Sequence, residues 1–244
     1  MGTVITVTSG KGGTGKTSIT GAVAASLSLM DRTVLCIDMD IGLRNLDISL
    51  GLNDRALMDF SDVALGRCPL ARAVVPHPTL KGLSLLTSPM SLPASLTPDK
   101  VRALLDNARS MYDYVLIDSP AGLGPGFRLA ICGADRVLVV ATNDTSSLRD
   151  AQRTVSELDH MRQVHLVMNR IQTKLLRRLR ATIDDAMDAA GLPLIGVVPE
   201  DPYVILCANL GQPLTDRGKR GAALACWNIA RRLEGQRVPI MRIR

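Results

Sequence analysis

Residues 10–17 have the composition and spacing of a phosphate-binding loop. They read Gly-Lys-Gly-Gly-Thr-Gly-Lys-Thr and fit the pattern G-x-x-x-x-G-K-[ST]. The glycines would let backbone N–H groups turn inward around an anion. Lys16 would contact the β- and γ-phosphates of a nucleotide, and the hydroxyl of Thr17 would bind Mg²⁺. The residues of this predicted nucleotide site are Gly10, Lys11, Gly12, Gly13, Thr14, Gly15, Lys16, Thr17 and Ser18.

Lys11 is a second lysine in the loop, and a phosphate-binding loop that works within one subunit does not need it. The residue types alone leave open another interpretation, a solvated charge on the loop. The run Lys-Gly-Gly-Thr-Gly-Lys-Thr resembles the signature of the deviant Walker A ATPases, K-G-G-x-G-K-[ST]. This resemblance implies that Lys11 reaches across a dimer interface to the nucleotide of the partner subunit, where it would act in catalysis together with Lys16.

Three carboxylates come at the ends of apolar runs and could serve a nucleotide bound in this loop. Asp38 and Asp40 could address Mg²⁺ or an attacking water. For either residue alone, capping of a turn is the alternative interpretation. Asp118 ends the run Leu-Ile-Asp, which is the Walker B arrangement, and its carboxylate would hold Mg²⁺ through a water or through Thr17.

Two longer segments carry a more specific resemblance. Residues 38–47, Asp-Met-Asp-Ile-Gly-Leu-Arg-Asn-Leu-Asp, resemble the switch I segment of the MinD family, and residues 118–122, Asp-Ser-Pro-Ala-Gly, resemble its switch II segment. The resemblance implies that Asp40 positions the attacking water, that Asp38 lies near the outer shell of the metal and that Asn45 lies near the dimer interface. The next residues, Leu-Gly-Pro-Gly at 123–126, depart from the family, which commonly has an acidic residue there.

Two further strand ends are candidates for binding the base. Asn169 and Arg170 follow one apolar run, and the triplet Pro-Glu-Asp at 199–201 follows another. A turn-forming role for Asn169 is the alternative. The MinD resemblance implies that Asn169, with Arg170 beside it, reads the adenine edge, and that the backbone of Pro199 and the carboxylate of Asp201 contact the same base. It also implies that residues 147–150, Ser-Leu-Arg-Asp, help to bind partner proteins.

The elements that must position these residues alternate along the chain. Strands are predicted at residues 3–8, 33–38, 83–86, 112–118, 136–141, 164–168 and 193–198. Helices are predicted at residues 16–30, 56–65, 98–109, 146–160, 174–187 and 217–233, of which 174–187 has a basic face. Prolines punctuate the connection at 69–78, and His77 within it is predicted to be a surface loop residue rather than a ligand.

This alternation predicts the α/β class, with a doubly wound, mostly parallel sheet that carries helices on both faces. In such a sheet ligands bind at the carboxyl ends of the strands, where the phosphate loop and the aspartates lie. The MinD resemblance assigns the same P-loop NTPase fold and covers nearly the whole chain. We expect one ATPase domain at residues 1–235, followed by a short basic tail at 236–244.

The composition of the 244-residue chain is that of a globular protein, with 46% hydrophobic residues and a formal net charge of +6. The charge favours an anionic partner such as a nucleotide, an anionic lipid surface or DNA. Five cysteines without a C-x-x-C pair argue against a disulfide framework or a zinc ribbon. No apolar run approaches the ~18 residues of a membrane-spanning helix. We therefore expect a cytoplasmic protein, and the resemblance implies peripheral association with the inner face of the cell membrane.

The resemblance implies a Mg²⁺-dependent ATPase that converts ATP and water to ADP and phosphate, dimerises with ATP and acts as a spatial switch in placing the bacterial division septum. Division-inhibitor and ATPase-activating proteins are the implied partners. One alternative is a ParA-type DNA-partitioning ATPase, which the basic stretch near Arg177 and the C-terminal arginines favour and the MinD-like switch I segment disfavours. Another is a flagellar-number-regulating ATPase. A third is an iron–sulfur reductase of the nitrogenase iron-protein type, which needs two cluster cysteines, whereas only Cys132 lies in a suitable region.

The end of the sequence departs from the MinD family, whose members end in a short amphipathic helix that binds lipid. Val-Pro-Ile at 238–240 is followed by Met-Arg-Ile-Arg, which is too short for two helical turns of about 3.6 residues each. Such a stretch could bury only a few apolar side chains in a membrane. We therefore expect this sequence to bind an anionic membrane surface weakly or not at all.

Overall fold

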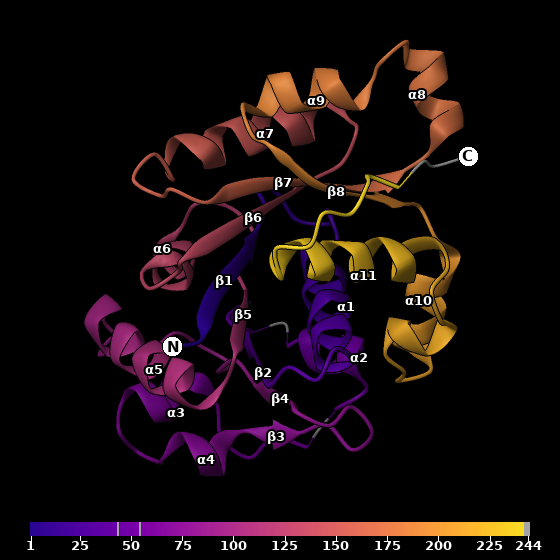
Figure 1. Ribbon diagram of the computed structural model, residues 1–244. Coiled ribbons are helices and arrows are strands. Elements are labelled where there is room, and N and C mark those ends of the chain that lie inside the picture. Colours follow the sequence, from indigo (N-terminus) through magenta and orange to yellow (C-terminus); the bar gives the residue numbers. More distant parts are fainter. Residues whose placement is uncertain (43, 54, 242–244) are drawn as a thin grey trace.

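A single sheet organises the structure, a computed structural model that describes residues 1–42, 44–53 and 55–241. Within these residues eight strands pair in the order β3-β4-β2-β5-β1-β6-β7-β8 (Figure 1). All neighbours are parallel except β3 and β4 at one edge. The strands are β1 (Thr3–Thr8), β2 (Val34–Asp38), β3 (Val75–Pro76), β4 (Leu83–Leu86), β5 (Tyr114–Asp118), β6 (Arg136–Ala141), β7 (Val164–Ile171) and β8 (Leu194–Pro199). The predicted α/β class with a mostly parallel sheet is confirmed.

β1 occupies the middle of the sheet, between β5 and β6. Its sequence, Thr-Val-Ile-Thr-Val-Thr, is β-branched throughout, and all but its first residue are buried. Such a run suits a parallel strand that is covered on both faces. From β1 the sheet extends in both directions, to β2 and β4 on one side and to β7 and β8 on the other. This doubly wound topology places a ligand crevice beside the carboxyl end of β1.

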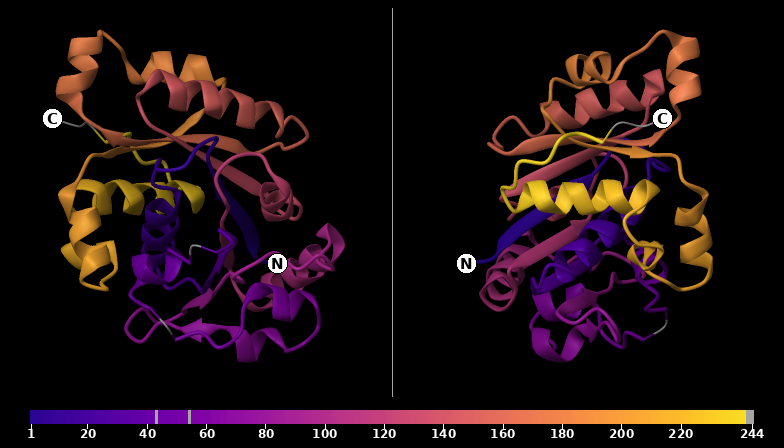
Figure 2. Two further views of the ribbon diagram at one scale, coloured as in Figure 1. Left: turned by 180° about the vertical axis from the view of Figure 1, so that it is seen from behind. Right: turned by 45° about the vertical axis from the view of Figure 1, so that its right-hand side comes forward.

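Helices cover both faces of the sheet. They are α1 (Lys16–Ser28), α2 (Leu46–Leu50), α3 (Phe60–Ala64), α4 (Leu70–Ala73), α5 (Pro98–Met111), α6 (Pro125–Ile131), α7 (Thr145–Ser156), α8 (Thr173–Leu179), α9 (Ile183–Ala190), α10 (Pro202–Asn209) and α11 (Gly221–Leu233), with a 3-10 turn η1 (Leu214–Arg217). On one face α1 and α11 share a core with Ile5 and Val7, and on the other α5 and α6 pack with Val4. The further views in Figure 2 show α7 and α9 over β6 and β7.

The helix predicted at 174–187 is wrong in one respect, because the structure divides it into α8 and α9. Arg180, between them, has a φ angle of 49°, which ends α8 in the left-handed region. Thr182 then begins α9 with a capping box, in which its hydroxyl accepts from the N–H of Asp185 and the carboxylate of Asp185 accepts from the N–H of Thr182. The continuous apolar spacing hid this break, although Thr182 and Asp185 have the pattern of a helix start.

Several short elements also differ from the predictions. The helix predicted at 56–65 is shortened to α3, which begins after the capping residue Asp59. The helix predicted at 217–233 begins at Gly221, because η1 precedes it. The helices α2, α4, α6 and α10 were not predicted, and each has eight residues or fewer. Such short helices depend on tertiary packing more than on their own sequence, which gives little periodicity to detect.

His77 is not the surface residue that its neighbouring prolines suggested. It is 9% exposed, and its Nε2 lies 2.9 Å from the carbonyl oxygen of Leu50. Its Nδ1 accepts from the backbone N–H of Leu80 at 3.0 Å. Burial lowers the pKa of His77. The neutral side chain therefore connects the loop that contains Leu80 with the end of α2 at Leu50.

Part of the predicted tail lies along the domain. The guanidinium of Arg232, in α11, donates to the carbonyl oxygens of Val238 and Pro239 at 3.0 and 2.6 Å. Met241 packs against the α1–α11 core. The remaining residues of that tail, 242–244, lie outside the described residues. Among the helices in the described part of the chain, none combines the length and apolar character needed to cross a membrane.

Candidate nucleotide-binding site

The predicted phosphate-binding loop connects β1 to α1 at the carboxyl edge of the sheet. Gly13 and Gly15 have φ angles of 79° and 90°, a region that residues with a Cβ rarely adopt. Among the described residues, no side chain caps α1 at Gly15, and the first turn of this helix carries no acidic residue. The N–H groups at the start of α1 are therefore available to an anion, and the helix dipole favours one there.

Lys16 and Thr17 begin α1 and lie beside the Walker B strand. Thr17 Oγ1 donates to Asp118 Oδ2 at 2.6 Å, and Thr20 Oγ1, one turn later, lies 3.3 Å from Asp118 Oδ1. Lys16 is only 6% exposed. Its positive charge opposes the burial that raises the pKa of Asp118. The structure thus brings together the lysine, hydroxyl and carboxylate that the two Walker motifs predict.

Asp38 and Asp118 are neighbours across the sheet, since β2 and β5 pair these two residues in register. Each is 1% exposed. Burial raises the pKa of Asp118 to about 7, and the charge of Asp38 adds to this shift. Burial also raises the pKa of Asp38 to about 6, although the backbone N–H groups of Asp40 and Leu46 donate to its carboxylate. A cation bound beside this pair would favour its charged form.

The donor set fits Mg²⁺, which prefers carboxylate and hydroxyl oxygens and usually completes its shell with waters and substrate phosphates. In the described part of the chain, no group of three or more His, Cys, Asp or Glu side chains could hold a metal alone. Thr17, with Asp38 and Asp118 acting through water, would therefore hold the ion only together with the phosphates of a nucleotide. The arrangement suits a metal that arrives with its substrate rather than a resident structural ion.

Asp40 lies on the loop after β2, and hydrogen bonds fix both its backbone N–H and its carbonyl. Its N–H donates to Asp38 Oδ1 at 2.9 Å, and its carbonyl accepts from Ser88 Oγ at 3.2 Å. Its carboxylate is half-buried. Burial raises the pKa of Asp40, and the charge of Lys16 opposes the rise. The carboxylate of Asp40 is therefore within electrostatic reach of Lys16, the predicted phosphate ligand. Leu43, in the predicted switch I segment, lies outside the described residues.

Lys11 has partners within its own chain. Its ammonium donates to Asp144 Oδ1 at 2.7 Å and to Ser146 Oγ at 2.8 Å, at the start of α7. Asp144 caps this helix by accepting from the N–H of Ser147. Although burial acts in the opposite direction, hydrogen bonds from Lys11, Ser146 and Thr142 lower the pKa of Asp144 well below its usual range. Lys11 and Asp144 are both partly exposed, so these contacts lie at the surface.

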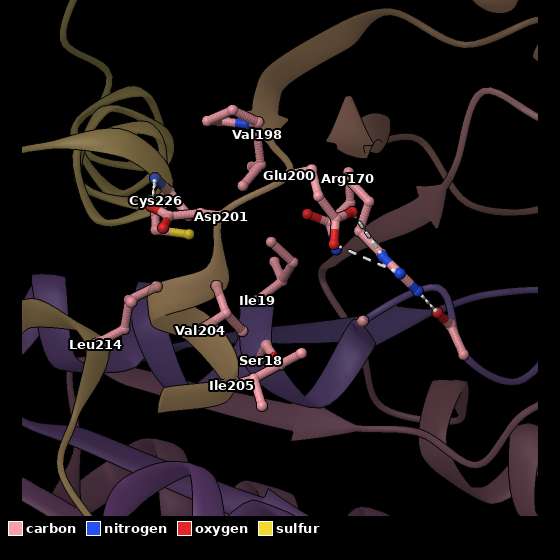
Figure 3. A pocket seen from close by; sticks show the side chains of 15 residues that line it. Ser18, Ile19, Arg170, Val198, Glu200, Asp201, Val204, Ile205, Leu214 and Cys226 are labelled. Atoms are coloured by element: carbon pink, nitrogen blue, oxygen red, sulfur yellow. Dashed lines mark hydrogen bonds and ion pairs between the residues drawn. The ribbon is translucent and has the colours of Figure 1, made fainter. Parts of the chain in front are cut away.

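A cavity of about 190 Å³ lies beside the loop, where β7 and β8 end (Figure 3). Asn169 is buried there, and its amide Nδ2 donates to the carbonyl oxygen of Thr14 at 2.8 Å. This bond fixes the orientation of the amide, so that its Oδ1 is the atom left to accept from a base. The apolar part of the wall is formed by Ile19, Val198, Val204, Ile205, Leu214, Ala222 and Cys226. A largely apolar slot with polar groups at its edge suits a planar base.

The residues that follow Asn169 and Pro199 also line this cavity. Arg170 pairs with Glu200 through a contact of 2.9 Å between Nε and Oε2. Asp201 Oδ1 accepts from the N–H of Tyr203 at 3.0 Å, and Asp201 Oδ2 accepts from the N–H of Ala222 at 2.9 Å. The carboxylate of Asp201 therefore caps the starts of α10 and α11, a role that the sequence interpretation did not include.

Three site features were missed from the sequence. Thr20 lies one helical turn after Thr17 and could have been found from the period of α1. Glu200 lies inside the triplet at 199–201, but its pairing with Arg170 has no local signal. The contacts of Lys11 with Asp144 and Ser146 join residues 133 and 135 positions apart, which only the folded sheet brings together.

Comparisons with known proteins agree with this geometry. A family model described as the CobQ/CobB/MinD/ParA nucleotide-binding domain matches residues 5–222. The septum site-determining protein MinD of Bacillus subtilis is 36% identical over 246 residues, which are 98% of this chain and 92% of that protein. MinD of Helicobacter pylori is 39% identical over 249 residues, again 98% of this chain and 92% of the relative.

Solved structures show the same similarity in three dimensions. A chain of the MinC:MinD cell division protein complex of Aquifex aeolicus matches with a TM-score of 0.91 at 37% identity, covering 98% of this chain and 99% of that one. MinD of Pyrococcus horikoshii complexed with Mg-ADP matches with a TM-score of 0.82 at 26% identity, covering 96% of each chain. A ParA family ATPase of Chlorobium tepidum has a TM-score of 0.80 at 23% identity, with 94% and 97% covered, and shares the fold.

Proposed function

The chain belongs to the MinD group of the CobQ/CobB/MinD/ParA nucleotide-binding family, and we propose that it is a Mg²⁺-dependent ATPase that dimerises with ATP and acts as a spatial switch in division-site placement. The observation that carries the proposal is the 2.6 Å hydrogen bond from Thr17 to Asp118 beside the buried ammonium of Lys16. A hydroxyl at the loop, a carboxylate at a strand end and a lysine are the parts that phosphoryl transfer from a nucleotide requires.

Each residue around this bond has a separate role in hydrolysis. When bound, Mg²⁺ neutralises charge on the β- and γ-phosphate oxygens. The loop N–H groups and Lys16 bind the same phosphates, and Asn169 accepts from the amino group of adenine. Asp40 orients the attacking water toward the γ-phosphate. Lys11 of the partner subunit adds a second positive charge to the transferring group, which is electrostatic stabilisation of the transition state.

For Lys11 to act across a dimer, its contacts with Asp144 and Ser146 must break. These contacts are partly exposed, with 33% of the Lys11 side chain and 49% of the Asp144 side chain accessible. Ion pairs at such positions contribute little to stability. A phosphate oxygen of a second subunit would offer the ammonium a more highly charged partner. The exchange is therefore a low-cost step in forming the dimer.

The relatives named for septum-site determination support the division-site role. Because one structural relative is MinD in complex with MinC, we assign a division-inhibitor protein as one partner of this chain. An ATPase-activating protein is the second. The segment Ser-Leu-Arg-Asp at 147–150, on α7 next to the partners of Lys11, is a suitable contact for either protein, because it could sense whether Lys11 is engaged. A switch driven by ATP would operate in the cytoplasm, where its nucleotide is available.

Mutation of Lys16 tests the nucleotide assignment. We expect Lys16→Ala to abolish ATP binding and hydrolysis, because both the phosphate contact and the buried charge beside Asp118 are lost. Isothermal titration with ATP and Mg²⁺ measures the binding, and release of phosphate measures the turnover. Circular dichroism of the variant confirms that the chain is folded. Near-normal affinity of a folded Lys16→Ala variant for ATP would refute the phosphate-loop assignment.

A ParA-type DNA-partitioning role is the second candidate, and one observation favours it. The two-turn helix α8 and the residue after it carry four exposed cations, Lys174, Arg177, Arg178 and Arg180. Contacts of such cations with DNA phosphates would release counterions and make binding depend steeply on salt. Binding to duplex DNA that requires ATP and falls by orders of magnitude between 50 and 200 mM salt, as about six or more phosphate contacts would produce, would favour this candidate over division-site placement.

A further inference from the structure

Arg170 occupies a special place on the rim of the base cavity. Its φ angle is 57°, and the pairing of β7 with β8 shifts register between Met168 and Ile171. As a result the side chains of Asn169 and Arg170 both line the cavity, although the two residues are consecutive. Asn169 is buried within it, whereas 54% of the Arg170 side chain is exposed. Arg170 therefore lines the cavity at its boundary with solvent.

The guanidinium of Arg170 joins two segments that line this cavity (Figure 3). Nε and Nη2 donate to the two carboxylate oxygens of Glu200, at 2.9 and 3.4 Å, and Nη1 donates to the carbonyl oxygen of Gly13 at 3.3 Å. Glu200 follows β8, and Gly13 belongs to the phosphate-binding loop. Arg170 can make these contacts together because the guanidinium presents its donors in a rigid fork, which a lysine lacks.

This bridge connects the two parts of the predicted nucleotide site. The loop that contains Gly13 would hold the phosphates, and the cavity that Glu200 lines would hold the base. The ribose of a bound nucleotide would then lie between them, and Arg170 bridges the same two segments. With the proposed function as premise, we infer that Arg170 and Glu200 form a gate over the nucleotide, whose opening controls both entry and release.

The exposure of the pair decides how strong such a gate can be. Glu200 is 33% exposed in its side chain, and Arg170 is 54% exposed. Pairs this accessible are weak, and salt screens them over about 8 Å at physiological ionic strength. The gate would therefore slow exchange by only about three- to five-fold. It would also open more readily as the salt concentration rises.

A gate and a direct nucleotide contact predict different kinetics. Loss of a contact made by the bound nucleotide raises the release rate alone and weakens affinity by the same factor. Loss of a gate raises the rates of association and release together and leaves the dissociation constant nearly unchanged. Glu200→Gln keeps the shape of the side chain and removes its charge, and the dissociation constant is compared in this variant. Arg170→Gln removes the bridge from the other side, but Arg170 is itself a predicted nucleotide-binding residue, so only its association rate tests the gate.

Stopped-flow fluorescence with a methylanthraniloyl derivative of ADP and Mg²⁺ tests the inference on the full chain. We expect both variants to bind and release the probe about three- to five-fold faster than the parent at low salt. We also expect added salt to accelerate exchange more in the parent than in the variants, because all of them share the screened attraction between the anionic probe and Lys16. Arg67→Gln is the matched control, because Arg67 forms a similarly exposed pair with Asp62, at 3.1 Å, and neither residue lines the cavity.

Three other outcomes would contradict the gate, and a fourth would contradict the proposed function. Faster release with unchanged association in Glu200→Gln would show that Glu200 contacts the nucleotide directly, and it would overturn the gate. Unchanged rates in both variants, or equal acceleration in Arg67→Gln, would also overturn it. A parent chain that binds no nucleotide at all would instead refute the proposed function, so the two failures are distinguishable.

Discussion

Lys11 is the residue whose proposed role depends on a second subunit. Lys11→Ala is expected to bind ATP with an affinity within a few-fold of the parent, because Lys16 and the loop N–H groups remain. It is expected to lose ATP-dependent dimerisation and to hydrolyse ATP at least about 100-fold more slowly, as when one transition-state donor is removed. Nucleotide titration, light scattering and phosphate release measure the three quantities.

Asp144→Asn is the matched control for this prediction. It removes the in-chain ion pair of Lys11 but keeps an oxygen that can cap α7. This variant is expected to dimerise and to hydrolyse ATP. If Asp144→Asn failed in the same way as Lys11→Ala, the in-chain contact rather than the contact across the dimer would be the important one. Full turnover by Lys11→Ala would contradict the role in trans more directly.

The sequence predicts those site residues whose motifs lie within a short stretch of the chain. The phosphate loop, Thr17 and Asp118 follow a fixed spacing after strands, and the structure brings them within hydrogen-bond distance. The second role of Asp201, as a cap of α10 and α11, could not be predicted. It depends on an N–H at Ala222, twenty-one positions away, which no local pattern contains.

The helix pair α8 and α9 shows how a single cap determines an element. Thr182→Ala removes the hydroxyl that accepts from the N–H of Asp185, and we expect it to cost about 1 kcal/mol in the free energy of unfolding. Urea denaturation measures this loss. Thr97→Ala is the matched control, because Thr97 precedes α5 without a side-chain cap hydrogen bond. Equal losses in the two variants would show that the capping box is not the cause.

Strands and helices were predicted correctly where the chain is an uninterrupted buried run. The prediction failed where a turn interrupts the apolar pattern. The central strands are apolar runs covered on both faces, and their bounds match within two residues, apart from β7, which extends through the bulge to Ile171. The stretch from Lys174 to Met187 has apolar spacing throughout, so its period conceals the left-handed turn at Arg180. The burial of His77 could not be predicted for a similar reason. The carbonyl that lies against its Nε2 belongs to Leu50, in the helix α2, which was not predicted from the sequence.

Glu234 connects distant parts of the whole molecule. It follows α11, and its carboxylate accepts from the guanidinium of Arg32 at 2.6 Å and from the hydroxyl of Tyr114 at 2.5 Å. The hydrogen bond from Arg32 lowers the pKa of Glu234 below its ordinary value of 4.5. The charged carboxylate therefore stabilises the folded state above pH 4.5, and this contribution is lost as the pH falls through the lowered pKa.

We expect Glu234→Gln to lower the thermal midpoint by about 2–4 °C at pH 7, since it weakens both hydrogen bonds. The difference from the parent should shrink as the pH falls from 4.5 through the lowered pKa, where Glu234 of the folded parent becomes protonated. Scanning calorimetry at several pH values measures both effects. Glu157→Gln serves as the control. The carboxylate of Glu157 is exposed and forms no ion pair with any residue that the structure describes. A difference that grew in acid would contradict the assignment.

ATP is proposed to convert this chain from a monomer to a dimer, and the Asp40→Ala variant isolates this step. Asp40 is proposed to orient the attacking water and not to bind the nucleotide, so its loss should leave ATP bound and unhydrolysed. Light scattering after size exclusion, with Mg²⁺ and either ATP or ADP, measures the mass against the 26.2 kDa of one chain. We predict a stable dimer with ATP and a monomer with ADP. A variant that binds ATP yet stays monomeric, or that has the same mass with both nucleotides, would contradict the account.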